Sequence, residues 1–205
     1  MMNYAAAYET ALARFRETPL ADVARYSGYP LEDNRLRVSF LGQEYWVEHP
    51  SGKFSPEPAA AGELPIFAQI LILHYLTNVR EVVQTGRLIS YKELPGGAIY
   101  IQPFANRSIR PLVETFGADP GRMAEAAKAI GGRSVKHGDA AAVVPVFPKV
   151  PVTLVIWGAD EEFPASGNIL FDASASEVLP TEDYAVLAGL VVGTLKGLAA
   201  NGPKS

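Results

Sequence analysis

Alternating apolar and polar residues predict a β-hairpin in the first quarter of the chain. Residues 36–41 alternate in this way, and residues 44–48 repeat the pattern after the turn Gly42-Gln43. A period of two is typical of a strand with one buried face. The stretch 49–62 that follows is rich in Pro and Gly, and we interpret it as a loop.

Helical periodicity predicts helices on both sides of this hairpin. Residues 4–17 are rich in Ala and carry apolar residues at helical spacing. Residues 65–78 are apolar almost all round, which is typical of a buried helix. The remaining predicted helices are a short one within 20–34, one from Asn106 or Ser108 to Phe116, one from Asp119-Pro120 to Gly131, and one over 181–198.

Short apolar runs predict strands in the second half of the chain. Runs over 133–136, 140–147, 151–157 and 169–171 are bounded by turn residues, and Leu88–Tyr91 and Ala98–Gln102 are weaker candidates. Helices and strands do not alternate regularly, which favours an α+β fold with a mostly antiparallel or mixed sheet packed against several helices.

Length and spacing predict a single domain over residues 1–205. The Pro/Gly-rich stretch 49–63 marks a small N-terminal lobe, residues 1–63, beside a main lobe, residues 64–200.

Composition narrows the class of protein. The chain has 205 residues, a formal net charge of -4 at pH 7 and no cysteine. Its basic residues are scattered along the sequence, which argues against a nucleic-acid binder. Without cysteine the chain can form neither disulfides nor thiolate metal sites.

The apolar runs do not indicate a membrane protein. None reaches the roughly 20 residues that span a bilayer. The first residues lack the basic and apolar regions of a signal peptide, so we expect a cytoplasmic location and no membrane partner.

Acidic residues gather where two predicted strands end. Asp160, Glu161 and Glu162 follow the strand 151–157, and Asp172 follows the run 169–171. Carboxylates can bind a divalent cation such as Mg²⁺ or act as general acid and base. They are equally typical of solvated loops and helix caps, so both interpretations stay open.

Histidine and arginine supply further candidates. His74 lies on the apolar helix, where it can serve as an axial ligand or simply bind a backbone carbonyl. His137 and Asp139 can form a base and its orienting group. Arg107 and Arg110 lie three residues apart, so on a helix they share one face and can grip a carboxylate or pair with the acids.

Short motifs between about residues 104 and 190 match those of one family. They are Arg107, Arg110-Pro111-Leu112, Glu114-Thr115-Phe116-Gly117, Gly138-Asp139-Ala140-Ala141, Phe147-Pro148, Val150-Pro151, Trp157, Asp160-Glu161-Glu162-Phe163-Pro164, Leu170-Phe171-Asp172 and Leu179-Pro180-Thr181-Glu182-Asp183. In these motifs the chain resembles the family called Domain of Unknown Function 3786, and the helix 66–76 resembles it more loosely.

The resemblance implies a context and no particular activity. Proteins of this family are typical of anaerobic bacteria and archaea, and some carry a cysteine-rich iron–sulfur segment similar to one in corrinoid proteins of one-carbon metabolism. This chain has no cysteine, so any cluster would belong to a partner protein.

The first functional hypothesis is a ligand-binding or accessory protein of anaerobic metabolism. It would bind a tetrapyrrole or corrinoid-type cofactor, or assist a corrinoid or iron–sulfur partner. The pocket would lie where the segment 157–172 meets the helix 106–116. Its residues would be Trp157, Phe163 and Phe171 as walls, Arg107 and Arg110 for ligand carboxylates, and His74 as an axial ligand.

Two alternatives belong to other classes. One is a hydrolase-like enzyme, dependent on carboxylates or a metal, that uses the acidic segment 160–172 with Asp160, Glu161, Glu162 and Asp172. The other is a structural partner that docks through the apolar C-terminal helix, although core packing explains that helix as well.

Overall fold

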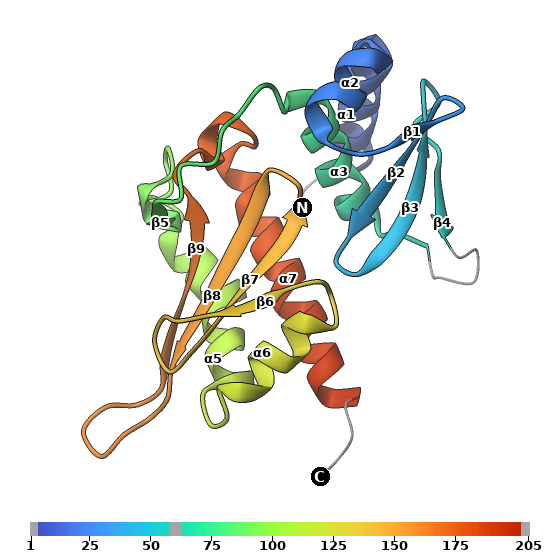
Figure 1. Cartoon of the computed structure of the whole chain (residues 1–205). Helices are drawn as coiled ribbons and strands as arrows, with labels where there is room; N and C mark the ends of the chain where they lie inside the picture. Colours follow the sequence, from blue (N-terminus) through green and yellow to red (C-terminus); the bar gives the residue numbers. More distant parts are fainter. Residues whose placement is uncertain (1–3, 58–62, 202–205) are drawn as a thin grey trace.

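The computed structural model describes residues 4–57 and 63–201, which form two antiparallel sheets with helices around them (Figure 1). This architecture confirms the predicted α+β class. The helices are α1 (Tyr4–Glu17), α2 (Leu20–Ser27), α3 (Ile66–Asn78), α4 (Ile101–Phe104), α5 (Arg110–Phe116), α6 (Gly121–Lys128) and α7 (Thr181–Asn201). The strands are β1 (Leu31–Glu32), β2 (Arg35–Phe40), β3 (Gln43–Glu48), β4 (Phe54–Glu57), β5 (Leu88–Ser90), β6 (Arg133–Val135), β7 (Ala140–Phe147), β8 (Val150–Trp157) and β9 (Ser166–Asp172).

The four-stranded sheet, in the order β1-β2-β3-β4, contains the predicted hairpin. Its turn is Leu41-Gly42, one residue earlier than the predicted Gly42-Gln43, since Gln43 is the first residue of β3. The φ angles of 50° and 79° match the primed turns that suit two-residue hairpins. A Cβ atom on Gly42 would lie 3.0 Å from the Ile130 side chain, so the hairpin tip packs against the segment after α6.

Strand β4 corrects the interpretation of residues 49–62 as a loop. Phe54–Glu57 pairs with β3, and Tyr45 is opposite Pro56. β4 lies at the edge of its sheet and pairs only with β3. Proline is tolerated there because no strand on the other side of β4 requires a hydrogen bond from a backbone N–H at this position. The rest of that prediction, residues 58–62, lies outside the described residues.

The five-stranded sheet has the order β5-β9-β8-β7-β6. It confirms the strands predicted over 133–136, 140–147, 151–157 and 169–171, and the weaker candidate Leu88–Tyr91. β7 and β8 form an antiparallel pair around the short connection Pro148-Lys149. Helices α5, α6 and α7 lie along this sheet, whereas α1, α2 and α3 lie beside the four-stranded sheet (Figure 1).

One long helical stretch corrects two further predictions. Ala98–Gln102 was a candidate strand and Asn106 or Ser108 a candidate helix start, but α4 begins at Ile101 and continues through a π-helical segment, Ala105–Ile109, into α5. Pro111 lies two residues after the end of that segment. Because proline lacks an N–H and crowds the carbonyl four residues earlier, it accounts for the local widening of the helix.

A single core spans both sheets. Tyr75 of α3 stacks on Phe147 of β7 with ring centroids 4.4 Å apart, and Phe147 also contacts Phe40 of β2. The Tyr75 hydroxyl donates to the Ser27 carbonyl at 2.7 Å. The buried side chains of both sheets belong to one cluster, in agreement with the predicted single domain.

Helix α7 is long and apolar enough to cross a membrane by length and composition alone. The expectation that no apolar run reaches a spanning length therefore does not hold for this helix. Its buried side chains, which include Tyr184, Leu187, Val191 and Leu195, form part of the core. A core helix of a folded domain meets the same criterion.

Because the core is continuous, we expect both sheets to unfold in one cooperative transition. The chain has two tryptophans, Trp46 in β3 and Trp157 in β8, one in each sheet. In the variants Trp46→Phe and Trp157→Phe, the urea midpoint from the remaining tryptophan should match the midpoint from circular dichroism. Separate midpoints for the two reporters would instead establish residues 1–63 and 64–200 as independent lobes.

Candidate functional site

The candidate site is built on α3, a helix that is almost entirely apolar. Pro65 precedes its first turn, and eight of its side chains are buried, among them Leu71, Leu73 and Tyr75. A histidine in such surroundings needs a polar partner, because an unpaired buried polar group costs about 1–3 kcal/mol. His74 has such a partner on another helix.

Asp183 is the partner of His74. It lies in the first turn of α7, where the helix dipole favours an acid. Its Oδ2 atom is 2.7 Å from His74 Nδ1, and the two side chains are 23% exposed for His74 and 11% for Asp183. Thr181 fixes the start of α7 from the other side, since its hydroxyl donates to the Pro95 carbonyl at 2.7 Å.

The pairing determines which ring nitrogen of His74 is available. An ionised carboxylate can only accept hydrogen bonds, so Nδ1 must carry the proton that points at Asp183. In the neutral imidazole, Nε2 then keeps its lone pair. A histidine held in this way can act as a general base or as a metal ligand, and carboxylate–histidine pairs are common behind metal-ligating histidines.

His137 has no comparable partner. Its ring meets Trp157 edge-on at 5.9 Å between centroids, and Asp139 accepts from the Gly158 N–H at 2.7 Å. Asp139 therefore fixes a turn at the end of β8. Within residues 4–57 and 63–201, no carboxylate contacts the His137 ring.

The predicted arginine pair lies on an exposed helix face. Arg110 Nε donates to Glu114 at 2.9 Å, in a pair whose side chains are 72% and 63% exposed. Arg107 is exposed in the π-helical segment. Figure 1 shows α5 well apart from α3, so the structure does not bring this pair next to His74.

The three predicted aromatic walls also lie apart. β8 and β9 are antiparallel, with Trp157 opposite Ser166 at one end and Val152 opposite Phe171 at the other. Trp157 and Phe163 are 38% and 65% exposed, whereas Phe171 is 1% exposed. Phe171 is a core residue, and the structure does not gather the three rings around one pocket.

The acidic residues also lie in two separate places, at the two ends of β9. Asp160 Oδ1 accepts from the N–H groups of Glu162 and Phe163 at 2.9 Å and 2.7 Å, so it shapes an exposed loop. Glu161 and Glu162 lie in the same loop. Asp172 lies at the far end of β9, a strand of seven residues that spans about 20 Å.

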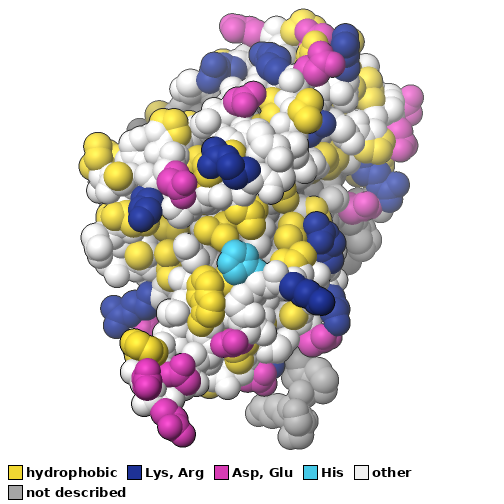
Figure 2. Space-filling model, turned by 60° about the vertical axis from the view of Figure 1, so that its left-hand side comes forward, with side chains coloured by type: hydrophobic (Ala, Val, Ile, Leu, Met, Phe, Trp, Pro, Cys, Tyr) yellow, Lys and Arg dark blue, Asp and Glu magenta, His cyan; other side chains and the backbone are white. Residues whose placement is uncertain are grey.

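Figure 2 shows acidic and basic side chains interspersed over the face drawn, with acidic side chains at both its upper and lower ends. In the described part of the chain, no group of three or more His, Asp or Glu side chains could hold a metal ion.

Asp172 is 5% exposed and connects three segments. Oδ1 accepts from the N–H and hydroxyl of Thr85 at 3.0 Å and 3.1 Å, and from the N–H and hydroxyl of Ser174 at 2.9 Å and 2.7 Å. Oδ2 accepts from the Gly86 N–H at 2.7 Å. Five hydrogen bonds to one carboxylate make Asp172 a structural anchor.

These hydrogen bonds lower the pKa of Asp172. Burial alone would raise the pKa of its carboxyl group, but the hydrogen bonds from Ser174, Thr85 and Gly86 stabilise the ionised form and hold the pKa far below its usual value.

A family model described as "Domain of unknown function" (DUF3786) matches residues 19–194, which is most of the chain. The chain belongs to this family. Comparisons with curated proteins and with solved structures give no match.

The sequence of this DUF3786 protein did not identify the partner of His74. Asp183 stood out only as the last residue of the family motif Leu179–Asp183, and the two residues are 109 positions apart. The sequence did indicate that a histidine on an apolar helix requires a polar partner. It did not indicate which acidic residue is that partner.

We expect Asp172→Asn to lower the free energy of unfolding at pH 7 by about 2–4 kcal/mol, because an amide cannot accept all five bonds. Since the folded pKa is lowered, the stabilisation by Asp172 is complete above the unfolded pKa near 4 and is lost as pH falls below it. Urea denaturation of both proteins from pH 7 to pH 3 measures this difference.

Glu161→Gln is the matched control, since Glu161 lies in an exposed loop and should change stability by less than about 0.5 kcal/mol. A difference between Asp172→Asn and the wild type that stays constant down to pH 3 would contradict the anchoring role of the ionised carboxylate.

Proposed function

We propose that this DUF3786 protein is a cytoplasmic ligand-binding or accessory protein in which His74 ligates the metal of a tetrapyrrole or corrinoid-type cofactor. The observation that carries the proposal is the contact of 2.7 Å between His74 Nδ1 and Asp183 Oδ2. It supplies one oriented imidazole, in which the lone pair of the neutral ring is on Nε2.

The donor set fits this kind of cofactor. One protein nitrogen is enough only for a metal whose other positions are filled by something else, as a macrocycle fills them in haem. A hydrogen bond from the ligating histidine to a carboxylate fixes the ring and raises its basicity. The bound group would supply the metal chemistry, and this chain would hold and orient it.

The family resemblance supports the same class of ligand. A chain without cysteine has no iron–sulfur cluster ligands of its own, which suits a role beside an iron–sulfur or corrinoid partner in anaerobic metabolism. The alternative, a hydrolase-like enzyme built on the segment 160–172, has weaker support because Asp160 and Asp172 lie at opposite ends of β9.

The test is an absorption titration of the anaerobically purified protein with haem and, separately, with aquocobalamin. We expect one of them to shift its spectrum on binding the wild type. His74→Ala should abolish the shift, and Asp183→Asn should weaken binding about 10–100-fold, as removal of such a carboxylate partner does at other metal sites.

His137→Ala is the matched control, because His137 is exposed and lacks a carboxylate partner in the described structure. It should bind like the wild type, and circular dichroism checks that every variant is folded. No shift with either compound, or a shift that persists in His74→Ala, would overturn the proposal.

The arginine hypothesis needs its own experiment. Arg107 and Arg110 were predicted to bind ligand carboxylates, and they lie on a different helix from His74. The double variant Arg107→Ala/Arg110→Ala should lose at least tenfold in affinity if they contact the ligand. Unchanged affinity would remove both arginines from the site and leave the role of His74 standing.

A further inference from the structure

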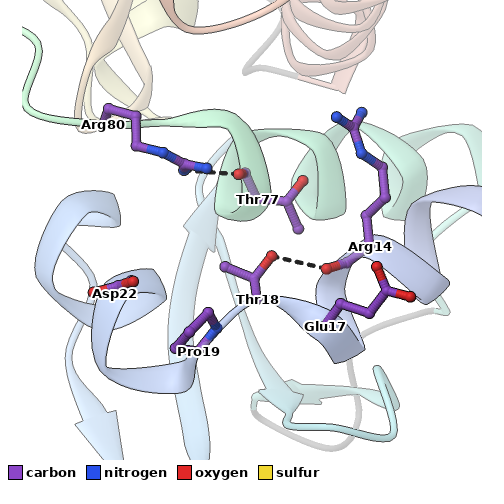
Figure 3. Close-up of a pocket in the computed structure, with 7 residues that line it drawn as sticks. All are labelled: Arg14, Glu17, Thr18, Pro19, Asp22, Thr77 and Arg80. Atoms are coloured by element: carbon purple, nitrogen blue, oxygen red, sulfur yellow. Dashed lines mark hydrogen bonds between the residues drawn. The ribbon is translucent and has the colours of Figure 1, made fainter.

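A polar cavity lies where three helix ends meet, one turn beyond His74 on α3. It has a volume of about 300 Å³. Figure 3 shows Thr77 and Arg80, at the end of α3, across the cavity from Thr18 and Asp22, which lie at the end of α1 and on α2. The other lining residues are Arg14, Glu17 and Pro19.

The charges around this cavity balance. Arg14 and Arg80 supply two positive charges, and Glu17 and Asp22 supply two negative ones. In the described part of the chain, none of these four side chains forms an ion pair with another. All four residues are exposed, and Arg80 and Asp22 lie on the same side of Thr18 and Pro19 (Figure 3). A cation and a carboxylate on one side of a cavity suit a ligand that carries both charges.

Backbone contacts hold the cavity in place. Arg80 Nη1 donates to the carbonyls of Thr77 and Val79 at 2.8 Å and 2.9 Å, which fixes its guanidinium over the end of α3. His49 Nε2 lies 3.2 Å and 3.1 Å from the carbonyls of Phe15 and Thr18, which fixes the end of α1. Arg80 keeps its other N–H groups for a ligand in a defined orientation.

The volume limits the size of the ligand. A volume of 300 Å³ is at the lower end of the roughly 300–1,000 Å³ that is typical of small-ligand pockets. A tetrapyrrole or corrinoid needs more room than that. The cavity is therefore a second site, independent of the cofactor proposed at His74.

We propose that this cavity binds a small zwitterion of the amino-acid type. The ligand carboxylate would accept hydrogen bonds from Arg80 and Arg14, whose planar donors match two oxygens. The ligand ammonium would donate to Asp22, which lies on the same side of Thr18 and Pro19 as Arg80 (Figure 3). Thr18 and Thr77 also line the cavity, and their hydroxyls donate to the carbonyls of Arg14 and Leu73 at 2.8 Å each.

The first experiment measures thermal unfolding of the full chain with each of the twenty standard amino acids. Acetate and methylammonium, which carry the two charges separately, are the control ligands. We expect at least one amino acid to raise the melting temperature, because a ligand selective for the folded state stabilises it. Neither control should do so at the same concentration.

Isothermal titration of the amino acid that gives the largest shift then tests the residues. Arg80→Gln and Asp22→Asn should each lower its affinity at least tenfold, whereas Glu161→Gln and His137→Ala should leave it unchanged. The proposal fails if no amino acid stabilises the protein, if acetate alone stabilises it equally, or if both cavity variants bind like the wild type.

Discussion

The carboxylate of Asp172 is the constraint on which the arrangement of the site depends. It ends β9, fixes the backbone at Thr85 and Gly86, and begins the turn at Ser174 that leads to α7. The Tyr184 hydroxyl donates to the Ala175 carbonyl at 2.7 Å, which ties α7 back to that turn. Asp183 therefore reaches His74 because an anchored carboxylate eleven positions earlier sets where α7 starts.

Helix α3 links the two proposed sites. On one side His74 meets α7, and one turn later Thr77 and Arg80 border the cavity that α1 and α2 complete. Its apolar faces hold the core together through Tyr75. The same helix thus supplies rigidity and the polar groups at its end, an arrangement that suits binding because rigid elements hold ligand groups more precisely than loops do.

Local pattern was sufficient for the elements with strong periodicity. The hairpin of β2 and β3, the buried α3 and the β7–β8 pair follow from alternation, apolar content and turn residues. Local pattern did not predict β4, because Pro56 argued against a strand there. It also failed for Ala98–Gln102, whose residues favour a strand but form turns and the start of α4.

The site was less predictable for a geometric reason. In the sequence, Asp160 and Asp172 each come at or after the end of a strand. The two strands are antiparallel neighbours, so their C-terminal ends lie at opposite ends of the pair. The expected carboxylate cluster therefore does not form. The pair of His74 and Asp183 depends on how two distant helices pack, and no local pattern carries that information.

The hairpin tip at Leu41-Gly42 has a consequence for engineering. Hairpin turns on a surface usually accept inserted residues, because they contact little else. Here the tip rests on Ile130 and joins the four-stranded sheet to the helical side of the molecule. An inserted tag or fluorophore loop belongs instead between Gly158 and Ala165, where the chain is largely exposed and joins β8 to β9.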